Sequence, residues 1–366
     1  MAYLLILLFF YQYLRLTVRT ESLLSNNVDI WHNSLWLSPI VLVWVLFIGG
    51  QYAVGTDYFS YLYIFNGGNL YYLLGKGDFG FVQIVQFFNS YGIHGQSIFF
   101  LFSFVWIIIL CYAGRTFTEN RYLYLFIFIF VTFPSMFNNQ MNGIRQYCAV
   151  YLFTLGVCLF YRQHRYWSIL PFLSMLTIHS SSMAMLVLFP VFLYLGYKVK
   201  KRRLLYIFLI IAIIFSISFP ADLLERIVGQ FAQYESYMDR SDDKGFSTDM
   251  NMISKITKYV YIPIVVYAIH FLPKMNLAKV NKNLFIVGVC GFCFKLALID
   301  VSIIRRMGAY FEILMCVPIL YLLIYLKERK SWKLAFIILY LLLPYVVKVT
   351  FAAKGEYLYN SIFFLD

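Results

Sequence analysis

The sequence is poor in charged residues, which make up only 13% of its 366 positions. An average soluble domain carries about 25%. This shortage argues against a soluble protein, because 62% of the residues are hydrophobic and apolar runs of roughly 20 residues recur from end to end. Backbone groups find no hydrogen-bond partners in lipid, so such runs must be helices. We therefore expect an all-α, polytopic integral membrane protein.

Several catalytic motifs are also missing. The sequence contains no G-x-x-x-x-G-K-[ST], no H-E-x-x-H, no Asp-x-Asp and no G-x-S-x-G. Nucleotide hydrolysis, zinc proteolysis and metal-dependent use of nucleotide sugars therefore lack the residues they need. All six cysteines fall in apolar runs, and the single C-x-x-C, from Cys290 to Cys293, has no second pair. We expect structural cysteines, no metal and no cofactor.

The basic residues outnumber the acidic ones by 30 to 17. They do not gather on one soluble face, as nucleic-acid binding would require. They form clusters between apolar runs instead, such as Arg115 with Arg121 and Arg162 with Arg165, as signals of membrane orientation do. We expect about eleven or twelve spans, and with all twelve candidates, placing every cluster in the cytoplasm puts both chain ends outside. The candidates are 2–14, 35–53, 96–114, 121–137, 143–161, 166–179, 181–197, 204–219, 257–272, 283–301, 307–326 and 333–350.

We expect a single transmembrane domain over 1–366 with two notable features on its outer side. The segment 54–95 follows the second span and contains two short amphipathic stretches, which are typical of helices lying at a membrane interface. The loop 220–255 is polar enough to be a lid or a solvated linker.

Arg145 stands just inside the start of an expected helix. A polar run from Asn138 precedes it, and Asn142 is the expected N-cap. An arginine at this place has the wrong charge for the helix dipole. The arrangement is tolerable where the arginine and the free N–H groups share an anion, which predicts a phosphate or pyrophosphate site. The alternative is an arginine that extends to the membrane interface.

Arg305 and Arg306 form a second basic pair between the apolar runs 283–301 and 307–326. The alternation of spans places this pair outside, against the usual distribution of positive charge. Arginine binds phosphate oxygens through two parallel hydrogen bonds, so two arginines suit a pyrophosphate. A salt bridge with Asp300 is the structural alternative.

Two outer-side residues have the chemistry of a general base. His179 precedes three serines within 166–197, a stretch that is long for one crossing and short for two, so the serines form an outer turn or the break of a re-entrant pair. Imidazole titrates near neutrality and can accept a proton from a sugar hydroxyl. Asp57 follows the second span and is the other possible base. A helix contact is the alternative for His179, and an ordinary helix cap for Asp57.

Short pieces of the sequence also stand in a recognisable order over most of the chain. They are Gly55-Thr-Asp-Tyr58 with Tyr61, Gly80-Phe81, Ile144-Arg-Gln146, Ile178-His179-Ser, Arg305-Arg306 with Tyr310-Phe311, and Tyr359-Asn-Ser-Ile-Phe-Phe364. As an ordered set they resemble the Wzy-type polysaccharide polymerases, in particular the EpsG-like branch. One departure is Asp78, where the resemblance implies a glutamate, and this leaves the role of Asp78 open.

The resemblance implies a glycosyltransferase similar to the membrane-embedded (GT-C type) lipid-to-sugar enzymes, in a bacterial inner membrane with its active site facing the periplasm. Such a polymerase joins undecaprenyl-pyrophosphate-linked oligosaccharide repeat units for O-antigen, capsule or exopolysaccharide, and transfers the growing chain to the non-reducing end of a new unit. Its implied partners are this donor and acceptor, a chain-length regulator, a repeat-unit flippase and membrane lipid, with no nucleic acid.

The chemistry of that reaction suits the residues found. Arg145, Arg305 and Arg306 would bind the departing pyrophosphate, whose negative charge they stabilise without a metal. Either His179 or Asp57 would deprotonate the attacking hydroxyl. The residues expected to bind or support the sugar are Tyr58, Gln146 and Tyr310.

Three other functions fit parts of the pattern. A transporter or flippase of lipid-linked or small anionic solutes also uses broken helices and buried basic groups. It should show inverted repeats and charges throughout the bilayer depth, whereas the key groups here gather on the predicted outer side. A membrane acyltransferase would use His179 as its base. A structural assembly subunit would tolerate alanine at all the outer polar residues.

Overall fold

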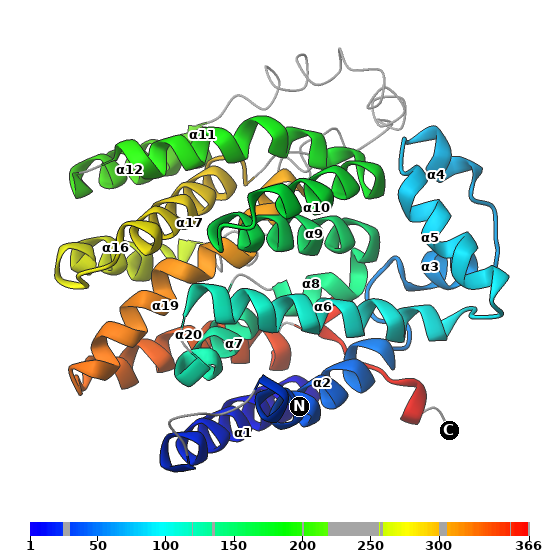
Figure 1. The fold of residues 1–366 in the computed structure, drawn as a ribbon, viewed down its shortest axis with the longest axis horizontal. Coiled ribbons are helices and arrows are strands. Elements are labelled where there is room, and N and C mark those ends of the chain that lie inside the picture. The colour runs from blue at the N-terminus through cyan, green and yellow to red at the C-terminus, as the bar shows by residue number, and fades with distance from the viewer. Residues whose placement is uncertain are drawn as a thin grey trace. The chain divides into compact units, whose positions relative to one another are not determined.

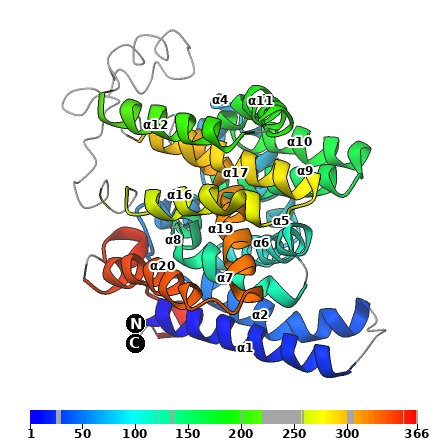
Figure 2. The same cartoon turned by 90° about the vertical axis from the view of Figure 1, so that its left-hand side faces the viewer.

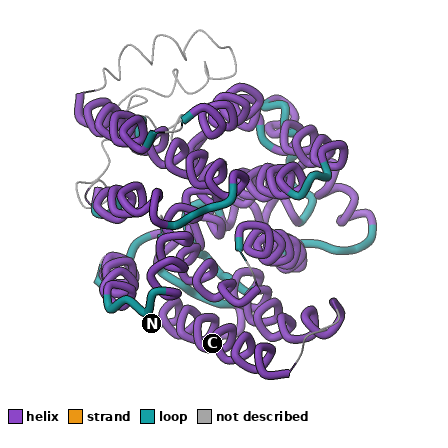
Figure 3. Tube along the Cα trace, turned by 60° about the vertical axis from the view of Figure 1, so that its left-hand side comes forward, coloured by secondary structure: helices purple, strands orange, loops and turns teal. Residues whose placement is uncertain are grey.

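The prediction of an all-α membrane protein is confirmed by the computed structural model, in which the described residues form helices and no strand (Figure 3). The chain divides into two compact units, Met1–Ser180 with Trp332–Asp366, and Ser181–Ser331. The single-domain prediction over 1–366 stays a prediction, and the predicted outer loop 220–255 lies outside the described residues. The structure describes residues 1–24, 30–118, 120–133, 136–199, 201–218, 256, 259–299, 306–351 and 353–364.

The described part of each expected span coincides with a helix or a helix pair. Six helices in the described ranges are long and apolar enough to cross a membrane, or seven if the bent pair Leu123–Thr132 and Met136–Asn142 is one span. Three further apolar helices are shorter, at Ala2–Thr17, Trp36–Gly49 and Ile262–Lys274. The chain is thus a multi-pass membrane protein, and the count of eleven or twelve crossings stays a prediction.

The first unit is built around α7, a helix that is hydrophobic on every side. All ten of its residues are buried, because α1, α6, α8 and α20 pack around it (Figure 1). Helix α6 also packs against α2 and α9, and α9 packs against α10. The helices of this unit are α1 (Ala2–Leu24), α2 (Ile30–Gly49), α3 (Tyr58–Phe65), α4 (Tyr71–Gly75), α5 (Phe79–Ser90), α6 (Gln96–Phe117), α7 (Leu123–Thr132), α8 (Met136–Asn142), α9 (Ile144–Tyr161), α10 (Arg165–Ile178) and α20 (Lys333–Thr350).

Helix α19 is the central helix of the second unit, since every residue from Glu312 to Leu323 is buried. Helices α16 and α17 pack against it, and α11 and α12 pack on α17 (Figure 2). Both α11 and α12 leave apolar residues exposed, as helices that face lipid do. The elements are α11 (Met185–Lys198), α12 (Arg202–Ser218), α16 (Ile262–Phe271), η3 (Leu272–Lys274), α17 (Lys279–Ala297), η4 (Ala309–Phe311) and α19 (Glu312–Glu328).

Hydrogen bonds gather the predicted outer segments of the first unit at one end of its helices. The Tyr3 hydroxyl donates to the Glu356 carbonyl at 2.6 Å, and the Asn138 amide donates to the same carbonyl at 3.4 Å. The tail also pairs with the end of α2, where the Tyr52 N–H donates to the Asn360 carbonyl at 2.9 Å. The last piece of the ordered set, residues 359–364, is therefore hydrogen-bonded to the end of α2 at this end of the unit.

At the other ends of α6 and α9 lies a predicted cytoplasmic cluster. The Arg162 guanidinium donates to the Thr116 hydroxyl at 2.9 Å and to the Arg115 carbonyl at 3.0 Å. The arginines that the positive-inside rule groups together are thus neighbours, at the helix ends remote from the predicted outer segments. Which end faces the periplasm stays a prediction.

Candidate functional site

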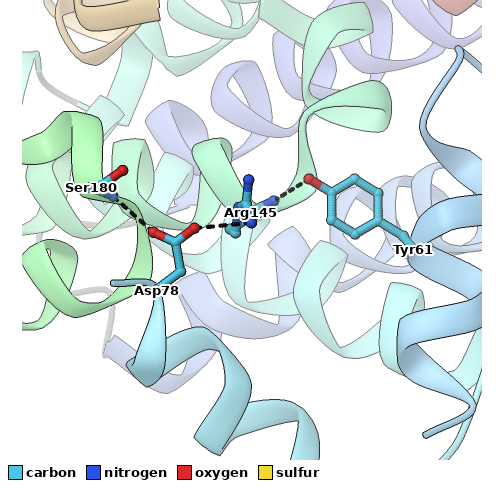
Figure 4. Close-up of polar contacts among 4 residues, drawn as sticks. All are labelled: Tyr61, Asp78, Arg145 and Ser180. Atoms are coloured by element: carbon cyan, nitrogen blue, oxygen red, sulfur yellow. Dashed lines mark hydrogen bonds and ion pairs between the residues drawn. The ribbon is translucent and has the colours of Figure 1, made fainter. Parts of the chain in front are cut away.

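An ion pair between Asp78 and Arg145 is the centre of the site in the first unit (Figure 4). Arg145 Nη1 lies 2.9 Å from Asp78 Oδ2, and the two side chains are 15% and 1% exposed. The other Asp78 oxygen, Oδ1, accepts the backbone N–H of Ser180 at 2.9 Å. A buried carboxylate is costly unless it is paired and hydrogen-bonded, so Arg145 and Ser180 are what allow Asp78 to occupy this position.

Arg145 is the second residue of α9, where the first N–H groups of the helix have no partner within the helix. Its own N–H donates to the Tyr61 hydroxyl at 3.2 Å (Figure 4). Its positive charge opposes the helix dipole, and the Asp78 carboxylate offsets that. The anion expected at this helix start is therefore supplied, in this structure, by the protein itself. Arg145 Nε is buried and has no hydrogen-bond partner among the described residues, so the guanidinium keeps an unused donor.

The prediction that Asn142 caps the following helix is wrong. Gly143 is the N-cap of α9, and Asn142 ends the preceding helix α8. The Asn142 side-chain oxygen accepts the Asp57 N–H instead, at 2.9 Å. Gly55 permits this close approach, since its φ is +77° and an added Cβ would lie 2.7 Å from Asn142 Cγ. The loop that carries Asp57 is thus hydrogen-bonded to the end of α8, directly before the Arg145 helix.

Asp57 itself occupies the N-cap position of α3, but its side chain makes no capping hydrogen bond. Its carboxylate accepts the Thr56 hydroxyl at 3.1 Å and is exposed. The alternative interpretation of Asp57 as an ordinary helix cap is therefore correct for its position, but its side chain does not make the hydrogen bond of a cap. An exposed carboxylate remains open to a substrate.

His179 follows α10 as its C-cap, with an extended backbone (φ −151°, ψ 120°). The side chain is largely buried, and the next residue, Ser180, is the one that donates to Asp78. The predicted break in 166–197 is confirmed here, because α10 ends at Ile178 and α11 begins at Met185. His179 is thus the neighbour in sequence of Ser180, whose backbone N–H contacts the carboxylate of the Asp78–Arg145 pair.

A close helix contact fixes the position of Asp78. Gly80, in the first turn of α5, meets α10 at Thr177, where an added Cβ would overlap the Thr177 hydroxyl and lie 2.7 Å from its Cβ. Asp78 is the N-cap of the same helix. Gly80, two positions after Asp78, is therefore packed against Thr177, two positions before His179, without room for a methyl group.

Gly80→Ala should accordingly destabilise the fold by about 1–3 kcal/mol, because overpacking moves α5 and with it Asp78. Adding Thr177→Ala should restore part of the loss, since it removes the hydroxyl and keeps Cβ. Gly75→Ala is the matched control, as nothing lies within 4 Å of a Cβ there. Thermal unfolding in detergent measures the effect, and equal behaviour of Gly80→Ala and Gly75→Ala would contradict the prediction.

Burial determines the protonation of the site. Desolvation raises the pKa of the Asp78 carboxyl above its ordinary value, and the Arg145 charge and the Ser180 N–H lower it only in part. Burial likewise raises the pKa of Tyr61 to about 12, so this phenol stays protonated at neutral pH. The site therefore holds a buried acid that binds its proton more tightly than an exposed aspartate does.

This shift predicts a pH dependence of stability. A raised folded-state pKa means that the stabilisation from protonated Asp78 is complete below the ordinary value of about 4 and is lost as the pH rises through the folded value. The melting temperature of the natural protein should therefore fall relative to that of Asp78→Asn as the pH rises above about 4 and through the folded-state pKa of Asp78. Groups common to both proteins cancel in this difference. A rise over the same range would mean that the ion pair outweighs desolvation.

A comparison with protein families adds to this geometry. The model of the EpsG family matches residues 34–362, most of the chain. The chain belongs to the EpsG family. The resemblance to EpsG-like, Wzy-type polymerases is thereby confirmed, and the family assigns the chain to polysaccharide polymerisation by glycosyl transfer, with lipid-linked sugars as the general substrate class. No curated protein and no solved structure matches the chain.

The remaining predicted site residues of this EpsG-family protein lie in both units. Tyr58 is buried, and its hydroxyl donates to Gln96 Oε1 at 2.8 Å, while Gln146 is half-buried near Arg145 on α9. In the second unit Arg306 is exposed, and the buried Tyr310 lies with its hydroxyl 3.3 Å from Ser181 Oγ. Arg305 and Asp300 lie outside the described residues. The roles proposed for all of them stay predictions.

Sequence reasoning about the EpsG-family chain left Asp78 without a role and did not single out Ser180. The signal for Asp78 was its place two positions before the Gly80-Phe81 piece. A carboxylate at the start of a helix that carries a piece of the ordered set is a candidate for a role in the site. Nothing in the sequence shows that residues 78 and 145 meet. The Ser180 contact is made by the backbone, which no side-chain pattern reveals.

A second buried ion pair lies in the other unit. Lys295 of α17 contacts the Glu312 carboxylate of α19, and both side chains are nearly inaccessible. Lys295 thus pairs inside the unit and does not extend to the interface. The six cysteines are free and buried, which agrees with structural roles. In the described ranges no three His, Cys, Asp or Glu side chains are grouped closely enough to hold a metal ion.

Proposed function

We propose that this protein polymerises oligosaccharide repeat units carried on undecaprenyl pyrophosphate, at the outer face of the bacterial inner membrane. The growing chain leaves its lipid carrier and is joined to the non-reducing end of a newly arrived unit. The observation that supports this most strongly is the Asp78–Arg145 pair, in which a buried carboxylate holds a partly accessible arginine. The same carboxylate accepts the N–H of Ser180, the residue that follows His179.

In the proposed reaction a hydroxyl of the acceptor sugar attacks the anomeric carbon of the donor. The bond from that carbon to the pyrophosphate oxygen breaks, and the lipid pyrophosphate leaves with the electron pair. Arg145 stabilises the charge that grows on it, through donors that Asp78 does not occupy. The proton of the attacking hydroxyl passes to His179 or Asp57. Asp78 acts as a positioning residue, because it holds the guanidinium and does not face the substrate.

Arg305 and Arg306 are proposed to bind the pyrophosphate of a lipid-linked substrate. Arg306→Lys keeps the charge and loses the planar fork, so it should reduce polymerisation, though by less than Arg306→Ala. Chain-length profiles of membranes that contain equal amounts of each variant measure this. Full-length ladders from both Arg306→Ala and Arg305→Ala would remove these two residues from the proposal. A chain-length regulator and a repeat-unit flippase are proposed as partners on the family resemblance alone.

The proposal is tested with purified protein in proteoliposomes and a synthetic polyprenyl-pyrophosphate repeat unit. We expect a ladder of longer glycolipids, released polyprenyl pyrophosphate and no loss of activity with EDTA. Loss of activity with the chelator would contradict the arginine-based mechanism. The transporter alternative predicts movement of a labelled repeat unit across the bilayer with no ladder. In a deletion strain, single repeats on the outer face agree with a polymerase, and units trapped inside agree with a flippase.

A further inference from the structure

A cavity of about 460 Å³ in the second unit is lined by Lys201, Arg202, Arg203 and Pro273. It lies where the start of α12 meets the end of α16. The Arg202 guanidinium donates to the His270 carbonyl at 3.1 Å, and this bond holds the two helices together at the cavity. The Asp78–Arg145 pair belongs to the first unit and contributes no residue to the lining of this cavity.

The lining of this cavity carries three adjacent positive charges. They stand at the N-terminus of α12, where the unpaired N–H groups and the helix dipole add further positive potential. In the part of the chain that the structure describes, no carboxylate forms an ion pair with any of the three. Such an arrangement is unfavourable when empty and favours an anion with several acceptor oxygens.

The helix that begins at the cavity is apolar and exposed along one side. Leu204, Ile207, Ile211 and Ile214 recur at helical spacing, and each is between 41% and 55% exposed. This stripe starts directly after Arg203, so the charged cavity and the apolar surface are continuous. A ligand that fits both has an anionic head and long apolar chains.

We propose that this cavity binds the phosphate of an anionic bilayer phospholipid whose acyl chains lie along α12. Basic pockets between transmembrane helices bind anionic head groups in this way. A polyprenyl phosphate has the same phosphate-and-tail chemistry, and inorganic phosphate has the head alone. The phospholipid is favoured because it has two tails to cover the exposed apolar stripe of α12.

The test is native mass spectrometry of the full-length protein, released from detergent with phosphatidylglycerol or with phosphatidylcholine of the same acyl chains. We expect phosphatidylglycerol to remain bound in preference. Lys201→Gln and Arg203→Gln should each weaken its binding about fivefold, as expected for one charge near the head group. Lys279→Gln, at the start of α17 and outside the cavity lining, is the matched control and should not change it.

Equal retention of the two phospholipids, or the same loss in Lys279→Gln, would overturn the proposal. Stronger retention of a polyprenyl phosphate would assign the cavity to the substrate carrier and also overturn it. Displacement of phosphatidylglycerol by millimolar inorganic phosphate would show that the acyl chains do not contribute to binding, and it would also overturn the proposal. The two cavity variants change exposed side chains, and size-exclusion chromatography verifies that they remain folded.

Discussion

Replacement of Arg145 by alanine should abolish long polysaccharide chains and leave single repeat units on the lipid carrier. Loss of one preorganised group that stabilises a departing oxyanion lowers the rate by about 10²–10³. At each elongation step that loss is repeated, so the ladder should collapse to its shortest member. A gel of lipid-linked glycans, from membranes matched for the amount of protein, measures the result.

Arg145→Ala also leaves Asp78 buried without its partner, and breaking a buried ion pair on one side costs roughly 3–5 kcal/mol. Loss of activity alone would therefore not separate catalysis from folding. The double variant Arg145→Met with Asp78→Leu removes both charges and keeps similar volumes, a change that is often neutral for stability. We expect this protein to reach the membrane in normal amounts, to melt near the natural temperature and to remain inactive.

The conservative variant Arg145→Lys keeps the charge beside Asp78 and loses the planar fork. Since lysine offers a point charge, it should retain the fold and only a small part of the activity. Normal ladders from the double variant would show that the ion pair has a structural role alone, and Arg145 would then be removed from the mechanism.

The choice of general base predicts the second large effect. If His179 accepts the proton, His179→Gln should slow polymerisation by about 10²–10⁴, while Asp57→Asn should cost far less. If Asp57 is the base, the order is reversed. The geometry favours His179, because it adjoins the residue that fixes Asp78 and lies in a water-poor position, whereas the Asp57 carboxylate is exposed.

The dependence of the rate on pH distinguishes a base from a residue that only supports the fold. With His179 as base, the rate in proteoliposomes should rise with pH as the imidazole loses its proton and then level off. In His179→Gln this rise should disappear, while the thermal stability stays close to that of the natural protein. A rise that persists in His179→Gln would assign the proton to another group.

Some of the site could be read from single segments of sequence. The polar run before an apolar helix marked Arg145, and the break at His179 followed from a hydrophobic stretch of unsuitable length. The error at Asn142 arose because a capping residue is recognised by its distance from a helix start, and Gly143 moved that start by one position. The contact between Asn142 and residue 57 spans 85 positions, which local patterns do not encode.

The sequence by itself determined that this chain is a bundle of membrane helices, because hydrophobicity and the need to satisfy backbone hydrogen bonds in lipid depend on composition along a run and on nothing distant. Its ordered short pieces also determined the EpsG family. Only the tertiary structure decided that Arg145 is paired with Asp78, that Ser180 completes that carboxylate, and that Gly80 leaves no space between α5 and α10. Those contacts join residues 67 to 102 positions apart, and they exist only once packing has brought separate helices within a few ångströms of one another.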